Sequence, residues 1–265
     1  MARSPSWRVH LTAQDGLTMF PYFIRCSALW LGLLLAAPAQ AGIVLNTTRV
    51  IYQATDKEVS LVVNNSGTAD ILAQSWLEAQ SNAENLPFVV TPPLARMAGG
   101  ARQMIRVIYA GEGLPEDRES VFWLNVQEIP QSAKDNQLQI AIRQRIKLFY
   151  RPAGLSDDPL EAAKNLQWRV HHGQLEVSNP TSYHVSMIQI DARQQGKTLF
   201  AADNRMLAPG QTVQLPLKQL ASGHAVDLRF ISINDFGAQE PYSAQVSGGQ
   251  TTQAIKATGV ITRTE

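Results

Sequence analysis

Two neighbouring stretches carry much of the β-strand signal of this chain. Residues 114–130 read LPEDRESVFWLNVQEIP, and residues 138–150 read LQIAIRQRIKLFY. Val121 to Ile129 and Leu138 to Tyr150 are rich in valine, isoleucine, leucine and aromatic residues, side chains that favour strands. The polar segment Gln131 to Gln137 separates them. We therefore predict two strands joined by a short polar connection.

Similar short runs precede these two strands. Turn-forming clusters such as Asn64-Asn65-Ser66-Gly67 and Ala98-Gly99-Gly100 separate them. Several short strands at this spacing are typical of a β-sandwich. The strands predicted before residue 114 are Val59 to Val63, Ile71 to Leu77, Phe88 to Thr91 and Met104 to Tyr109.

The composition changes at Arg151 to Gly154, and a second strand-rich region follows. We predict an all-β fold of two immunoglobulin-like sandwiches arranged end to end, with domains at 42–153 and 160–265 and a linker at 154–159. The strongest helical candidate, Pro159 to Asn165, is short. The strands predicted for the second domain are Trp168 to His171, Leu175 to Ser178, Val185 to Ile190, Val213 to Leu217, Leu228 to Ile233 and Tyr242 to Val246.

The N-terminal segment is typical of a secretion signal. Arg25 supplies positive charge, Ser27 to Ala37 is a short apolar run, and Ala39-Gln40-Ala41 is a small-x-small cleavage triplet. The run is too short to span a bilayer comfortably. We expect residues 1–41 to be the signal peptide. Residues 1–18 are a possible upstream extension, since Met19 is an alternative start.

Composition argues against several classes of protein. Lysine plus arginine number 23 and aspartate plus glutamate 22, so no basic excess points to nucleic acid. The single cysteine, Cys26, lies in the expected signal, so we predict a mature chain without a thiol or disulfide. His171-His172 has no further ligands at metal-binding spacing, and Asp157-Asp158 has no visible acid–base partner. We therefore expect no metal, no cofactor and no enzymatic activity.

One row of aliphatic residues has two readings. Leu138, Ile140 and Ile142 alternate with other residues, so on a strand they share one face. They could be part of an ordinary half-buried strand. They could instead belong to an edge strand that fills pockets on another protein, with main-chain hydrogen bonds supplying affinity.

The chain resembles the periplasmic pilus chaperones of the PapD-like family. The resemblance spans the expected mature chain and is strongest at Leu114 to Pro130, through Asp117-Arg118-Glu119-Ser120, Trp123, Asn125 and Ile129-Pro130. Further matching segments are Asn46 to Tyr52, Thr91-Pro92-Pro93, Gln139 to Pro152, Asn179-Pro180-Thr181, Met206 to Pro209 and Ile233 to Gly237.

The resemblance implies a periplasmic location and a cleft between the domains. There, Arg49 and Lys147 would bind the C-terminal carboxylate of a fimbrial subunit. The implied donor residues, which complete the subunit's unfinished sandwich, are Leu138, Ile140 and Ile142. Strict alternation puts Lys147 on the face opposite this row.

The resemblance also implies an ion-pair network between the domains, formed by Glu119, Arg151 and Asp235. We expect it to hold the interdomain angle rather than to add much stability, because exposed ion pairs contribute little. The short connection before the donor row resembles the short-loop branch of the family. The implied partners are fimbrial subunits and an outer-membrane usher, with self-association possible in the free protein. A pilus subunit is the main alternative, but it would be a single domain with a disulfide.

Overall fold

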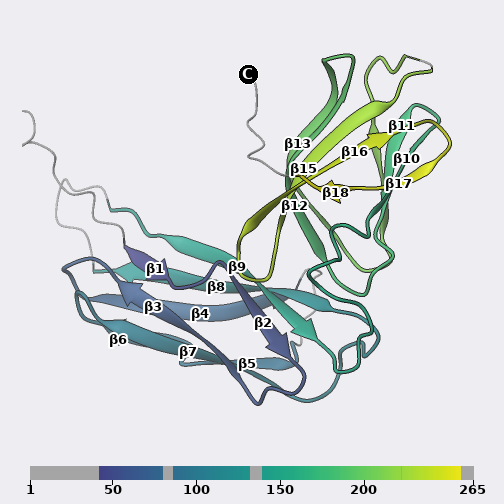
Figure 1. Ribbon diagram of the computed structural model, residues 1–265. Helices are drawn as coiled ribbons and strands as arrows, with labels where there is room; N and C mark the ends of the chain where they lie inside the picture. Colours follow the sequence, from purple (N-terminus) through teal and green to yellow (C-terminus); the bar gives the residue numbers. More distant parts are fainter. Residues whose placement is uncertain (1–41, 80–85, 132–138, 222, 258–265) are drawn as a thin grey trace, which may run out of the picture. The chain divides into compact units, whose positions relative to one another are not determined.

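The structure is a computed structural model that describes residues 42–79, 86–131, 139–221 and 223–257 (Figure 1). These residues form strands, turns and loops, and no helix occurs among them. The all-β fold class predicted from the sequence is confirmed. The predicted signal peptide and Leu138 lie outside the described residues.

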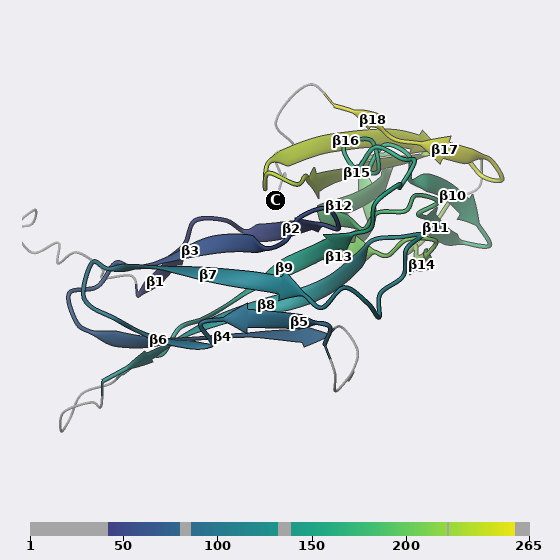
Figure 2. The same ribbon diagram turned by 90° about the horizontal axis from the view of Figure 1, so that it is seen from below.

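The first sandwich consists of two sheets that face each other across one core (Figures 1 and 2). One sheet has the order β1 (Ile43–Leu45), β3 (Val59–Asn65), β7 (Arg102–Tyr109), β5 (Phe88–Thr91). The other has the order β2 (Arg49–Gln53), β9 (Arg143–Arg151), β8 (Ser120–Pro130), β4 (Ile71–Ala79), β6 (Leu94–Met97).

The strands of this sandwich follow the two-residue period of their sequences. On β8, Phe122, Leu124 and Val126 are buried in the core, and on β9 Leu148 and Tyr150 do the same. The residues between them belong to the outer face of the sheet, because successive side chains on a strand point in opposite directions. The positions of Trp123 and Lys147 on that outer face matter for the site described below.

The second sandwich is built in the same way. One sheet has the order β14 (Thr212–Pro216), β11 (Gln174–Ser178), β10 (Gln167–His171), β17 (Thr251–Gln253). The other has the order β13 (Lys197–Leu207), β12 (Val185–Gln194), β15 (Val226–Ile233), β16 (Gln239–Val246), β18 (Ile255–Lys256). In its core the rings of Trp168 and Phe230 are 5.4 Å apart, and Phe230 stacks on Tyr242 at 5.3 Å.

Three expectations from the sequence need correction. Residues 159–165 form consecutive turns rather than a helix, with one hydrogen bond of helical spacing, from Asn165 N to Glu161 O. The strand predicted to start at Leu138 begins at Arg143. The long strand β13 was not predicted, because its sequence KTLFAADNRML mixes polar and apolar residues without regular alternation.

The pairing of β9 changes along its length. On one side it pairs antiparallel with β8 over residues 143–150. On the other side β2 pairs with it in parallel, and only from Lys147 to Arg151. Residues 143–146 therefore have no paired strand on that side among the described residues. A half-free strand edge of this kind can accept a strand from another chain.

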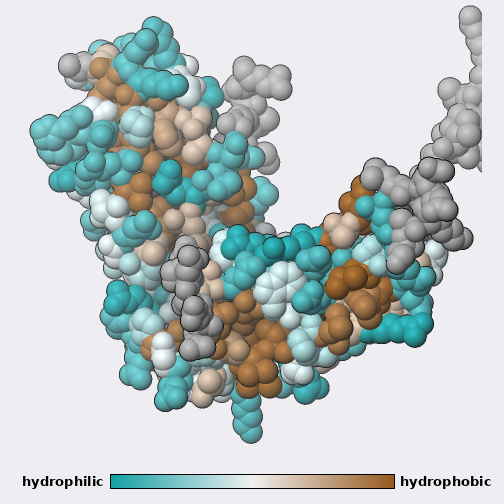
Figure 3. All heavy atoms as spheres, turned by 180° about the vertical axis from the view of Figure 1, so that it is seen from behind, coloured by the Kyte–Doolittle hydropathy of each residue, from teal (hydrophilic) through white to brown (hydrophobic). Residues whose placement is uncertain are grey.

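Apolar side chains also reach the surface. Figure 3 shows patches of hydrophobic residues between hydrophilic ones on one face of the molecule. The large apolar residues with the highest exposure are Phe236 at 86% and Ile140 at 72%. Phe236 lies in the turn before β16, and Ile140 just before β9.

The two sandwiches share a corner that was not visible as a sequence repeat. Asn65 follows β3's core residues and is buried; its Nδ2 donates to the carbonyls of Ala69 and Ala98 at 2.9 and 3.0 Å. Asn179 follows β11, is equally buried, and donates to Tyr183 O and Ala208 O at 2.7 and 3.0 Å. The same amide thus ties the same loop in both halves.

Asn179→Asp is expected to unfold the second sandwich more easily. The change replaces an amide donor with a carboxylate facing carbonyl oxygens, which should lower the free energy of unfolding by about 3 kcal/mol. Urea denaturation followed by tryptophan fluorescence measures this. The control Asn204→Asp, at an exposed position of β13, should change the value by less than about 0.5 kcal/mol. Equal losses in both variants would contradict the role of the buried amide.

Candidate functional site

Arg49 and Lys147 stand next to each other on parallel strands. Arg49 is the first residue of β2, and its register partner on β9 is Lys147. Like charges at paired positions of neighbouring strands repel each other. The fold therefore holds two cations together at a cost, in the part of the first sandwich that contacts the second.

Lys147 reaches from the outer face of β9 to the second sandwich. Its Nζ donates to Ser186 Oγ of β12 at 2.8 Å and lies 5.9 Å from the ring centre of Trp123. Burial, together with the charge of Arg49, lowers the pKa of Lys147 to about 8. Burial therefore makes the charge of this amine less favourable than in water, although the amine stays mostly protonated at neutral pH.

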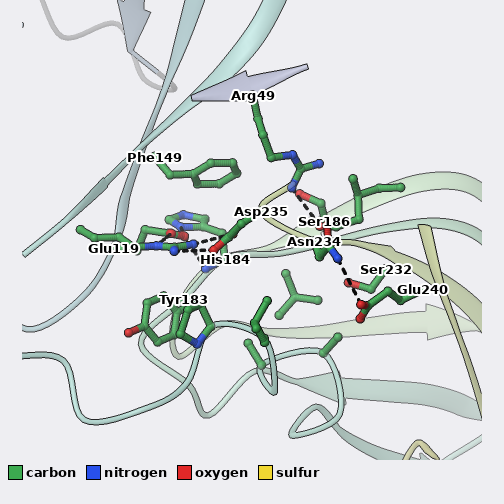
Figure 4. Close-up of a pocket in the computed structure, with 17 residues that line it drawn as sticks. Arg49, Glu119, Phe149, Tyr183, His184, Ser186, Ser232, Asn234, Asp235 and Glu240 are labelled. Carbon is green, nitrogen blue, oxygen red and sulfur yellow. Dashed lines mark hydrogen bonds and ion pairs between the residues drawn. The ribbon is translucent and has the colours of Figure 1, made fainter. Parts of the chain in front are cut away.

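Arg49 also bridges the sandwiches. Its Nη1 donates to Ile233 O at the end of β15 at 2.8 Å, and its guanidinium lies 5.9 Å from the ring centre of Phe149 (Figure 4). Burial, with a smaller contribution from the charge of Arg151, lowers the pKa of Arg49 despite the carboxylates of Asp235 and Glu119. The Nε atom is buried and has no hydrogen-bond partner among the described residues.

Neither cation forms an ion pair with a carboxylate in the described part of the chain. Each has one polar contact to the second sandwich and keeps unused donors, since a guanidinium has five N–H groups and an ammonium three. Two adjacent cations with free donors are suited to bind one carboxylate. The structure thus brings Arg49 and Lys147 together as a candidate anion site.

Arg151, at the end of β9, forms the centre of an ion-pair network. Its Nε donates to Glu119 Oε1 at 2.8 Å, and its Nη1 and Nη2 donate to the two oxygens of Asp235 at 2.6 and 2.7 Å. Glu119 immediately precedes β8, and Asp235 lies in the turn after β15. The three predicted network residues are therefore in direct contact.

The network is buried, which differs from the exposed setting assumed from the sequence. The side chains of Arg151 and Glu119 are 8% and 1% exposed. Glu119 Oε2 also accepts hydrogen bonds from the backbone N and the Nδ1 of His184, at 2.7 and 2.9 Å. Burial opposes the charge of Arg151, but its hydrogen bonds to Asp235 and its attraction to Glu119 win and raise its pKa. Breaking this network should therefore be costly.

Arg49 and the ion-pair network line one pocket between the two sandwiches, whereas Lys147 is not among its lining residues (Figure 4). The first sandwich contributes two cations, a carboxylate and an aromatic ring, and the rest of the lining is a mixture of polar and apolar residues from 159–163, 183–186 and 232–240. The labelled lining residues are Arg49, Glu119, Phe149, Tyr183, His184, Ser186, Ser232, Asn234, Asp235 and Glu240.

The donor row lies outside strand β9. Leu138 is outside the described residues, whereas Ile140 is largely exposed and Ile142 is half-buried. The carbonyl of Ile142 accepts a hydrogen bond from Glu128 N at 2.8 Å, so the segment joins the sheet at this residue. The row continues the core-facing series of β9, while Lys147 belongs to the opposite face.

A row of cations and aromatic rings leads along the outer face of the sheet from Lys147. The guanidinium of Arg145 lies 4.1 Å from the ring centre of Trp123, and that of Arg143 lies 4.8 Å from that of Trp76. The carboxylate of Glu78 contacts both arginines, with Oε2 3.4 Å from Arg145 Nε and Oε1 2.5 Å from Arg143 Nη2. Positive charge therefore continues from the anion site along the outer face of the sheet, where the two arginines lie over rings of β8 and β4.

Sequence reasoning missed two residues of the site. Nothing in the sequence marks Ser186 as a site residue, since it is one serine in the strand sequence VSMIQIDARQ. His184 precedes that strand and contacts Glu119 only because the two sandwiches meet there. The Asn125 side chain, which lies within the quoted motif, accepts hydrogen bonds from Arg143 at 2.7 and 3.0 Å.

Other chemistry finds no support in the described residues. They contain no group of three or more histidine, cysteine, aspartate or glutamate side chains that could hold a metal ion. The ring centres of His171 and His172 are 3.8 Å apart, at the exposed point where β10 ends and a turn begins. Within the described ranges, no helix has the length and apolar character needed to cross a bilayer.

Fold and site together define a protein of two β-sandwiches with two adjacent cations between its domains that form no ion pair among the described residues, beside a strand edge that is only partly paired there. Residues 42–156 match the family model described as pili and flagellar-assembly chaperone, PapD N-terminal domain, and residues 161–244 match pili assembly chaperone PapD, C-terminal domain. The chain belongs to this family of pilus-assembly chaperones, as the sequence motifs predicted.

Curated relatives agree. The chaperone protein FimB/FhaD of Bordetella pertussis is 41% identical over 231 residues, covering 80% of this chain and 91% of the relative. The chaperone protein FimC of Escherichia coli K12 is 37% identical over 221 residues, covering 80% and 88%.

Solved structures extend this similarity to three dimensions. The crystal structure of the YadV chaperone has a TM-score of 0.68 and 38% identity, covering 78% of this chain and all of that one. The SafB chaperone of Salmonella enterica, solved in complex with the SafA pilin, has a TM-score of 0.66 and 27% identity, covering 79% and 99%.

Arg151→Met is expected to lower the free energy of unfolding by about 3–5 kcal/mol, because it leaves the buried carboxylate of Glu119 without its counter-ion. Guanidinium denaturation measures the loss. The matched control Arg96→Met removes a pair with Asp70 in which the arginine side chain is 78% exposed, and it should cost less than about 1 kcal/mol. A similar small effect of both substitutions would show that the network does not stabilise the fold.

Proposed function

We propose that this chain is a periplasmic chaperone that binds fimbrial subunits by donor-strand complementation and prevents their aggregation. It then delivers them to an outer-membrane usher for pilus assembly. The observation that carries the proposal is the adjacency of Arg49 and Lys147 without a carboxylate partner, next to the free edge of β9. In this proposal the C-terminal carboxylate of the subunit is the missing anion.

The direction of the client strand follows from this anchor. A segment that ends at Lys147 and lies along residues 139–146 runs in the same direction as β9. Its backbone would pair with the strand edge that β2 leaves open. The donor side chains Leu138, Ile140 and Ile142 would then cover the exposed core of the subunit. The high exposure of Ile140 supports such a role, since a large aliphatic side chain in water gains from burial.

The ion-pair network has a positioning role in this proposal. Glu119, Arg151 and Asp235 would fix the second sandwich relative to the first, so that Ser186 and Ile233 O hold the ends of the two cations. No reaction is proposed, and no cofactor is required. The free protein could also self-associate through its open strand edge.

The proposal also includes export of the chain and its division into a signal peptide, two domains and a linker. Residues 1–41 would be removed as a signal peptide, residues 42–153 would form the client-binding domain, 154–159 the linker and 160–265 the second domain. A short apolar run followed by a small-x-small triplet supports export.

Arg49→Ala and Lys147→Ala are each expected to reduce the recovery of a soluble one-to-one complex with a co-expressed fimbrial subunit by at least about tenfold. Each removes a charge-assisted hydrogen bond to the carboxylate. The complex is measured by co-purification from the periplasm, with denaturation curves to verify folding. Lys164→Ala, an exposed lysine paired with Glu161, is the control. Unchanged recovery in both cleft variants would refute the carboxylate site.

Binding of a peptide that ends in a free carboxylate should weaken as pH rises above about 8, because the pKa of Lys147 is lowered to about 8 in the free protein. Below that value Lys147 is protonated and affinity should be flat. Above it, each pH unit should cost up to about tenfold until Lys147 also loses its proton in the complex. Calorimetry from pH 6.5 to 9.5 measures this.

The matched variant Lys147→Arg should bind with no such decline, because a guanidinium stays protonated throughout this range. An identical decline in Lys147→Arg would assign the titration to another group.

A further inference from the structure

A carboxylate interrupts the apolar row of strand β8. Phe122, Leu124 and Val126 face the core of the first sandwich, and Glu128 is the next residue on the same side of the strand. Glu128 is 8% exposed. Its Oε2 is buried and has no hydrogen-bond partner in the described part of the chain. A buried carboxylate oxygen without a hydrogen-bond partner destabilises the fold, so a cation or a hydrogen-bond donor next to Glu128 Oε2 would be stabilising.

Gly42 is the residue that lies against this oxygen. A Cβ atom added to Gly42 would be 1.8 Å from Glu128 Oε2 and 2.9 Å from its Cδ. Since a Cα–Cβ bond is about 1.5 Å long and N–Cα about 1.46 Å, the backbone nitrogen of Gly42 is at most about 4.8 Å from that oxygen. Ser66 holds the other end of the residue, because its N and Oγ donate to Gly42 O at 3.1 and 2.6 Å.

We propose that Glu128 is the binding site for the α-ammonium group of Gly42, which is released when the predicted signal peptide is cut after Ala41. This inference rests on the secretion step of the proposed function. In the uncut chain the Gly42 nitrogen is an uncharged amide. After cleavage it carries a positive charge and additional N–H donors, and rotation about the terminal residue brings it to the carboxylate.

The geometry also explains why the first residue of the mature chain is glycine. Any other residue would place its Cβ on the carboxylate oxygen. A side chain at this position would therefore displace the Glu128 carboxylate from its place, and glycine avoids that displacement.

The pair lies at the base of the donor segment. The backbone N of Glu128 donates to Ile142 O at 2.8 Å, at the point where the donor row joins the sheet. Gln144 Nε2 donates to Ile43 O, the residue after Gly42, at 2.6 Å. Removal of the signal thus fastens β1, and with it the base of the donor segment, to the core of the first sandwich.

The test compares four secreted proteins in a double-mutant cycle: the natural chain, Glu128→Gln, an insertion of one glycine between Ala41 and Gly42, and both changes together. The insertion keeps the cleavage triplet but moves the ammonium by up to about 3.8 Å. Glu128→Gln should raise the unfolding equilibrium constant of the natural chain by a factor at least about tenfold larger than that for the inserted chain. Urea denaturation measures the constants, and mass spectrometry verifies each N-terminus.

A second readout does not depend on the variants. The α-amino group of the folded natural protein should be acylated at pH 7 at least about tenfold more slowly than in urea-unfolded protein, because it is protonated and buried against Glu128. Equal effects of Glu128→Gln in both backgrounds, or equal acylation rates, would overturn the ion pair alone. A mature N-terminus other than Gly42 would overturn the inference together with the proposed cleavage, while client binding through Arg49 and Lys147 is judged by its own variants.

Discussion

Two positive charges held side by side on parallel strands are the constraint on which the rest of the site depends. Arg49 and Lys147 repel each other, and burial adds to the cost of charging them. The protein tolerates this because β2 and β9 are each fixed by their sheet and because the second sandwich supplies one oxygen to each cation. In the proposed function, these two cations, which form no ion pair within the described part of the chain, are already in position for the anion before any client arrives.

The buried ion-pair network around Arg151 explains how Arg49 and Lys147 are held next to each other. Arg151 is four residues beyond Lys147 on the same strand, and its guanidinium grips Asp235, two residues after Ile233. The hydrogen bond from Arg49 to Ile233 and the ion pair from Arg151 to Asp235 therefore act on the same turn. Buried ion pairs are better at fixing geometry than at adding stability relative to apolar packing. In the proposed function, the geometry that they would fix is the position of Arg49 and Lys147 against the second sandwich.

The sequence predicted much of the fold and several residues of the candidate site, but the fold and the site residues were predicted on different grounds. Strand alternation predicted the all-β fold, because period-two burial is a local property of β8 or β12. The site residues Arg49 and Lys147 came from resemblance to a family, since nothing in their own neighbourhood separates them from surface charges. Ser186 and His184 were not predictable, because their roles arise only when two separately folded sheets meet. Glu128 could have been noticed as a charge in an apolar row, but its partner depends on where the chain is cut.

The asparagine corner shared by the two sandwiches has a further consequence. Because Asn65 and Asn179 close the same loop, the two halves can be read as two copies of one plan, and function must then reside where the copies differ. One difference between them lies at a sheet edge. In the first copy the edge next to β9 is covered by a parallel strand from the beginning of the chain, and only partly. In the second, the corresponding edge of β16 pairs at Tyr242 and Ser243 with β18, an antiparallel strand from the chain's other end. Among the described residues, the direction of the covering strand therefore separates the two edges, and a client strand that runs parallel to β9 would continue the pairing that β2 begins.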